Sequence, residues 1–148
     1  MVNIEQVKQW AEGRWALGTL HGVSHWERVE RNGLMLATQG CDLTVIRLFA
    51  YLHDSCREND GYDEQHGPRA AKMIAGLRNT LLKDLTDHQF ELLQTACYLH
   101  TTTHRTGDPT IDACFDADRL DLGRVSITPD PTKMATEKGK ELARDLNK

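Results

Sequence analysis

The sequence lacks the features that would place the protein in a membrane or in a disulfide-bonded class. It has no run of about 18 apolar residues, which a transmembrane helix requires, and its start, MVNIEQVKQW, has no apolar signal core. The four cysteines are scattered and form no C-x-x-C pair, which argues against a zinc knuckle and a disulfide framework. We therefore predict a cytoplasmic protein with reduced cysteines and no membrane partner.

An excess of positive charge is also missing. The formal net charge is −4, from 18 Lys and Arg against 22 Asp and Glu, and this argues against nucleic acid as a partner, because such binders present a basic face. The hydrophobic fraction of 39% and the length of 148 residues suit a globular protein with a proper core. We predict a single domain over residues 1–148.

Strand signals are absent, and helical periodicity dominates. Two segments have the form of a capping box, Ser24 to Glu27 and Thr86 to Gln89, and predict helices that begin at His25 and Asp87. Asp42 and Asp108 are candidate N-caps of two further helices. The fold class that follows is all-α. The predicted helices cover about residues 4–15, 25–37, 43–53, 68–77, 87–102, 110–120 and 137–146.

A polar pair, His53-Asp54, closes the apolar segment Leu43 to Leu52. That segment is apolar nearly all round, which is typical of a central helix. Burying an imidazole beside a carboxylate is costly unless something compensates both groups. A divalent cation would do so, because histidine nitrogen and aspartate oxygen are ordinary ligands of transition metals.

Helical spacing places further ligand types on buried faces. His100 and His104 continue an apolar stripe one turn apart, Asp118 follows the stripe that begins at Ile111, and His25 starts a helix. Each has a simpler alternative, such as a core histidine bonded to a carbonyl, or a salt bridge of Asp118 with Arg119 or Arg124. Burying all of them without a shared partner would cost several kcal/mol. One or two metal ions would compensate them together.

The ordered motifs resemble the H…HD…D signature of the HD-domain superfamily of metal-dependent phosphohydrolases. Residues 21–29 resemble the H-x-x-R-V opening of that family, residues 48–54 its apolar helix ending in HD, and residues 117–120 its closing A-D-R-L segment. The resemblance covers roughly residues 20–125, which leaves 126–148 as a C-terminal turn and helix. The segment 53–67 resembles a subgroup of small bacterial members without an assigned substrate.

The resemblance implies a single-domain helical bundle around a central metal site. It implies that one divalent ion is held by His25, His53, Asp54 and Asp118. In members with two ions the aspartate that matches Asp54 bridges them. The candidates for the second ion are His66, His100 and His104.

The implied activity is hydrolysis of a small phosphorylated molecule, with nucleotides among the candidates, by metal-activated water at Asp54. Arg57 is the first candidate for a phosphate clamp and Arg28 the second, because an arginine fork donates two parallel hydrogen bonds. A structural salt bridge is the alternative for both arginines. Nitrogen-rich ligation favours Mn, Fe, Ni, Co or Zn over Mg.

Two other functions stay open at this point. Some members of the superfamily are di-iron oxygenases, which would require a complete two-metal site that includes His66, His100 or His104. A non-catalytic metal-binding regulatory module would be favoured by missing ligands, and none of the four main ligands is missing.

Overall fold

Seven α-helices and two short 3-10 helices, with no strand, form the part of the chain that this computed structural model describes, residues 1–147. This confirms the all-α prediction. The elements are α1 (Ile4–Arg14), α2 (Val23–Leu36), α3 (Leu43–Leu52), α4 (His66–Gly76), α5 (Asp87–Leu99), α6 (Pro109–Arg119), η1 (Leu122–Val125), η2 (Pro131–Lys133) and α7 (Glu137–Leu146).

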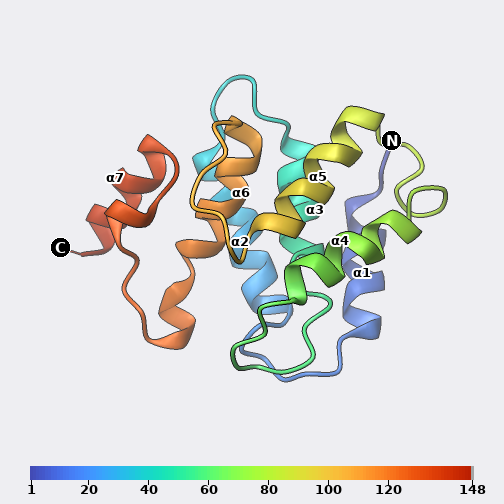
Figure 1. Ribbon diagram of the computed structural model, residues 1–148, viewed down its shortest axis with the longest axis horizontal. Coiled ribbons are helices and arrows are strands. Elements are labelled where there is room, and N and C mark those ends of the chain that lie inside the picture. The colour runs from blue at the N-terminus through green and yellow to red at the C-terminus, as the bar shows by residue number, and fades with distance from the viewer. Residues whose placement is uncertain (148) are drawn as a thin grey trace.

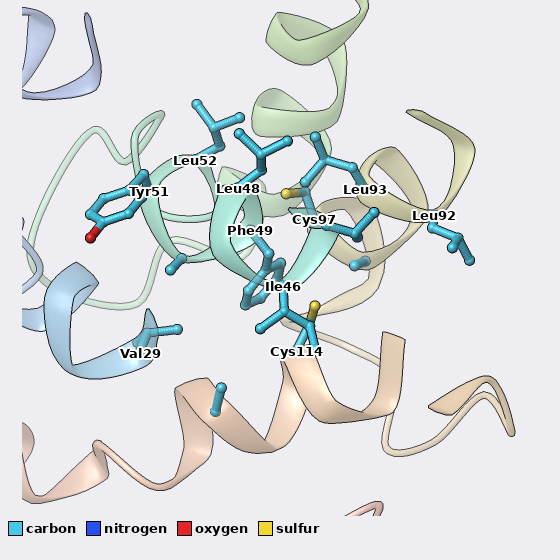
Figure 2. Packing of buried hydrophobic residues seen from close by; sticks show 14 of the residues in the cluster. Val29, Ile46, Leu48, Phe49, Tyr51, Leu52, Leu92, Leu93, Cys97 and Cys114 are labelled. Carbon is cyan, nitrogen blue, oxygen red and sulfur yellow. The ribbon is translucent and has the colours of Figure 1, made fainter. Parts of the chain in front are cut away.

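Helix α3 is the centre of the bundle and packs against α1, α2, α5 and α6. Figure 2 shows its side chains meeting α5, where Leu93 and Cys97 are labelled. Both of those residues are fully buried, as is Leu48 of α3. Because α3 is apolar around most of its circumference, with Arg47 as its one charged residue, burial is its favoured state. The helix therefore carries its polar C-terminal pair, His53-Asp54, into the interior.

Local capping fixes the starts of three helices as predicted. Asp42 accepts a hydrogen bond from the Val45 amide at the start of α3, and Thr86 forms a complete capping box with Gln89 at the start of α5. Asp108 caps α6, with proline in the first turn. Each of these caps satisfies backbone amides that have no partner inside the helix.

The predicted capping box at Ser24 is wrong. Helix α2 begins at Val23, its N-cap is Gly22, and no side chain caps it. The preceding turn closes tightly on Trp15, whose Nε1 donates to the Gly18 carbonyl, and a Cβ at Gly22 would lie 3.0 Å from that carbonyl oxygen. The helix therefore starts two residues earlier than predicted, with His25 already in its first turn.

Helix α5 ends earlier than predicted, at Leu99 rather than near Thr102. His100 is its C-cap, and the chain then leaves the helix axis. His104 is exposed, with its Nε2 3.2 Å from the Met134 carbonyl oxygen. The prediction that His104 lies one helical turn from His100 is therefore wrong.

The C-terminal segment packs through α6. Helix α7 lies at one end of the molecule, while α1 and α4 lie toward the other (Figure 1). The stretch at 126–131, predicted as turns, lies between the 3-10 helix η1 and the end of η2, and neither of these helices was predicted.

Within the described residues, no helix is long and apolar enough to span a bilayer. All four cysteines are free.

Candidate metal centre

Four predicted ligands from three helical regions converge at the inner end of α3. One ligand atom from each of His25, His53, Asp54 and Asp118 lies within 4.8 Å of the others. The His25 Nε2 atom is 3.1 Å from Asp54 Oδ2, 3.2 Å from Asp118 Oδ1 and 3.2 Å from His53 Nε2. Three of these side chains are buried, and that of Asp118 is partly exposed.

A second group shares Asp54 with the first. Its members are Asp54, His66 at the start of α4 and His100 at the end of α5. His66 Nε2 is 2.9 Å from Asp54 Oδ1 and 2.9 Å from His100 Nε2. Asp54 therefore offers one oxygen to each group, which is the arrangement of a carboxylate that bridges two ions.

Hydrogen bonds fix the tautomers of the four histidines. In each ring Nδ1 faces an oxygen that can only accept, so Nδ1 carries the proton and donates it. The acceptors are Asp121 Oδ2 for His25, the Phe49 and Ala50 carbonyls for His53, the Asp63 carbonyl for His66 and the Cys97 carbonyl for His100. In its neutral form each ring then directs the Nε2 lone pair toward the centre.

With the four rings neutral, the centre therefore has acceptors that face one another without a donor. In that state the buried Asp54 Oδ2 and Asp118 Oδ1 accept no hydrogen bond within the described residues. Two Nε2 atoms face each other at 3.2 Å in one group and at 2.9 Å in the other. Buried acceptors without a donor are costly, and a divalent cation removes that cost in both groups. The donor set fits a transition metal.

Comparison with known proteins identifies the fold. No family model and no curated protein matches the chain. A solved structure does: the crystal structure of a predicted HD superfamily hydrolase from an uncultured Thermotogales bacterium is similar over 97% of this chain and 83% of its own, with a TM-score of 0.74 and 25% sequence identity. This chain has the HD-domain fold. The family resemblance of its ordered motifs is thereby confirmed.

Electrostatics keep the two carboxylates of the HD centre ionised. Burial raises the pKa of Asp54 and of Asp118, but the imidazoles around them, His53 foremost, outweigh it and hold both pKa values well below the usual range. Burial lowers the pKa of His25, whereas hydrogen bonds with Asp118, Asp121 and Asp54 raise it to about 10. The negative potential that favours a proton on His25 Nε2 also attracts a metal ion, so proton and metal are alternatives at this atom.

Of the two predicted arginines, only Arg57 reaches the centre. A cavity of about 220 Å³ opens on the two candidate ligand groups and is lined by Arg57 and Arg124 as well as by Asp54 and Asp118. The Arg57 Nε atom lies 3.3 Å from Asp54 Oδ1, and its Nη1 donates to two carbonyls of the loop after α3. Arg28 does not line this cavity, because its Nε is held 2.7 Å from Asp121 Oδ1.

Three residues of the site were not among the sequence candidates. Asp121 orients the His25 ring, and Arg124 Nη2 lies 3.5 Å from Asp118 Oδ1. His21 is buried and joins the loop after α3 to Arg124: its Nε2 donates to the Asp60 carbonyl, while its Nδ1 lies 3.4 Å from Arg124 Nε. Arg124 is predicted above only as a possible salt-bridge partner of Asp118, and that ion pair is present. No local pattern assigned Asp121 or His21 to the site.

Proposed function

We propose that the protein is a metal-dependent phosphohydrolase that acts on a small phosphorylated molecule. The observation that carries the proposal is the pair of ligand groups that share Asp54, in which histidine Nε2 atoms meet at its two oxygens. The similar Thermotogales protein, described as a predicted HD superfamily hydrolase, supports the same class of reaction.

Each residue then has a distinct task. His25, His53, Asp54 and Asp118 would hold one divalent ion, and Asp54, His66 and His100 a second. Such an ion, when bound, supplies Lewis-acid polarisation and lowers the pKa of water. Arg57 and Arg124, which line the cavity, would offset the charge that develops on the phosphoryl oxygens. The cavity's small volume favours a phosphate group of a small molecule over a polymer.

A di-iron oxygenase would use the same two ligand groups. The two arginines that line the cavity favour an anionic substrate and hence the hydrolase. Iron analysis combined with electron paramagnetic resonance separates the two, since an oxygenase of this kind requires a mixed-valence iron pair. The non-catalytic alternative is disfavoured by the complete set of ligand types around Asp54.

The test is phosphate release from a panel of nucleotides and sugar phosphates by the metal-loaded protein, wild type and Arg57→Ala. We expect kcat/KM to fall about 100-fold in the variant, because a donor to the developing charge is lost, while the metal content stays at the wild-type value. Arg31→Ala, an exposed arginine of α2, is the matched control. Undiminished turnover in Arg57→Ala would remove this residue from the reaction, and no turnover of any ester would refute the proposed class.

A further inference from the structure

A second cavity, of about 490 Å³, adjoins the metal centre. Arg124 lines both this cavity and the one over the candidate ligand groups, so the two spaces share a side chain. The remaining walls come from Arg28 of α2, from Leu120, Asp121 and Gly123 around the start of η1, from residues 126–129 and from Leu146 of α7. None of the roles proposed above for the metal ligands, Arg57 and Arg124 uses this space.

Arg28 presents an unused hydrogen-bonding edge in this second cavity. Its Nε is fixed on Asp121 Oδ1 at 2.7 Å, and neither Nη atom has a hydrogen-bond partner within residues 1–147. The Asp121 carboxylate is itself held by His25 through its other oxygen, so the guanidinium is positioned before any ligand arrives. A fixed arginine with two free amino groups suits bidentate recognition of a carboxylate or a phosphate.

The cavity also has two exposed apolar residues in its lining. Ile127 and Leu146 are 51% and 56% exposed, although both are large hydrophobic residues. Ser126, with φ 63°, is the one non-glycine residue with positive φ in the described chain, and residues 127–129 that follow it line the cavity. A backbone conformation of this kind is uncommon for serine and is often associated with functional sites. The cavity thus combines a cationic side with an aliphatic side.

We propose that this second cavity binds a second anionic group of the substrate, a carboxylate or a phosphate, joined to the scissile phosphate by an aliphatic spacer. The inference rests on the proposed function and specifies its substrate class. Water would cleave the ester to inorganic phosphate and an alcohol that retains the second anion. Arg28 would then act in substrate selection, beside the reacting group rather than on it, and Arg124 would lie between the two anions.

The first test compares matched esters that differ only at the far end. Alkyl phosphates and ω-carboxyalkyl phosphates with three to six methylenes are assayed with the metal-loaded protein, and the ratio of their kcat/KM values is the readout. Damage to the metal centre lowers both values and cancels in that ratio. We expect wild type to prefer the carboxylated ester at least tenfold at one spacer length.

Two variants test whether the preference for the carboxylated ester depends on the second cavity. Arg28→Gln removes the second anion's partner and Ile127→Glu places a like charge at the cavity wall, so both should lower the ratio about tenfold. Met35→Glu, a 51% exposed hydrophobic residue elsewhere on the surface, is the matched control and should retain the wild-type ratio. A ratio near one in wild type, or a ratio unchanged by Arg28→Gln, would overturn the inference.

A binding measurement separates this inference from the proposed reaction. Isothermal titration of the metal-loaded protein with ω-carboxyalkyl phosphonates and alkyl phosphonates requires no turnover. Tighter binding of the carboxylated probe by about tenfold, lost in Arg28→Gln, would support the second anion site even if no ester were hydrolysed. Equal affinities for both probes at every spacer length would overturn it even if hydrolysis were observed.

Discussion

At the scale of single residues, Asp121 matters because it decides which nitrogen of His25 is free. Its Oδ2 accepts from His25 Nδ1 at 2.7 Å, and this leaves Nε2 toward Asp54 and Asp118. A carboxylate in this position also makes the imidazole a stronger donor to a metal. Asp121 lies outside the ligand groups, but its position therefore controls the chemistry of His25 inside them.

We expect Asp121→Asn to weaken metal affinity about 10- to 100-fold, because the amide keeps the shape but removes the charge that supports His25. Competition with a chromogenic chelator measures the dissociation constant. Asp130→Asn, on a carboxylate remote from the centre, is the control and should leave it unchanged. Wild-type affinity in Asp121→Asn would show that His25 needs no orienting carboxylate.

At this scale, the site residues could be predicted from the sequence only where helical spacing or the order of the motifs is informative. His25, His53, Asp54 and Asp118 were predicted to share a site, and the structure brings them together; their role as ligands stays a prediction. The contact of Asp121 with His25 could not be predicted, because the two residues are 96 positions apart in the sequence. His104 was misplaced because the apolar stripe of α5 continues in the sequence beyond the point where the helix ends.

At the scale of elements, the close approach of α4 to α5 sets the second ligand group. A Cβ at Gly67 would lie 2.7 Å from the Cys97 carbonyl oxygen and 3.0 Å from that of Tyr98. Only glycine permits this approach, and the adjacent His66 thereby reaches His100. The contact of two backbones thus determines the distance between two imidazoles.

Gly67→Ala should push α4 away from α5, destabilise the protein by about 1–3 kcal/mol and lower the occupancy of the second metal position. Urea denaturation and metal-to-protein stoichiometry measure the two effects. Gly76→Ala in the same helix is the matched control, since a Cβ there meets nothing within 4 Å. Equal behaviour of the two variants would mean that the helix spacing does not govern the second group.

A buried carboxylate on α6 holds the C-terminal segment. Asp116 is fully buried and accepts hydrogen bonds from the Ala135 and Thr136 amides, the Thr136 hydroxyl and Arg119. Truncation would leave these donors without a partner in the interior. Its function is therefore structural, although its residue type and burial resemble those of the ligand aspartates.

We expect Asp116→Ala to lower the free energy of unfolding by about 3–5 kcal/mol, the cost of leaving buried charge and donors uncompensated, without changing the metal content of the folded fraction. Asp87→Ala removes the ion pair between the fully exposed Asp87 carboxylate and Arg78 and should cost less than about 1 kcal/mol. Urea unfolding curves compare them. Similar losses in both would show that the segment is held by packing alone.

The prediction of elements succeeded where the determinants are local. Asp42, Thr86 and Asp108 cap helices from the adjacent sequence, so their roles could be predicted. The end of α5 depends instead on distant groups: Arg119 donates to the Thr103 carbonyl, and Thr101 donates to the Glu64 carbonyl. No pattern within 100–104 reports those bonds.

At the scale of the whole molecule, the helices surround a polar centre whose side chains come from five separate regions of the chain. Helices α2 to α6 or their ends supply the two ligand groups, and the apolar α3 carries the shared aspartate into the middle. The all-α class followed from periodicity and from the lack of strands. The convergence of the candidate ligands could be predicted from the order of the family motifs. Periodicity alone could not predict it, because it indicates which face of a helix is buried but not which helix packs against that face.

We infer above all that Asp54 belongs to a metal centre that His104 does not share. Elemental analysis of purified wild type, Asp54→Ala and His104→Ala, each after loading with the same divalent metal and desalting, tests it most directly. We predict one to two equivalents of metal in wild type and in His104→Ala, and none in folded Asp54→Ala. Metal content unchanged in folded Asp54→Ala would contradict the account.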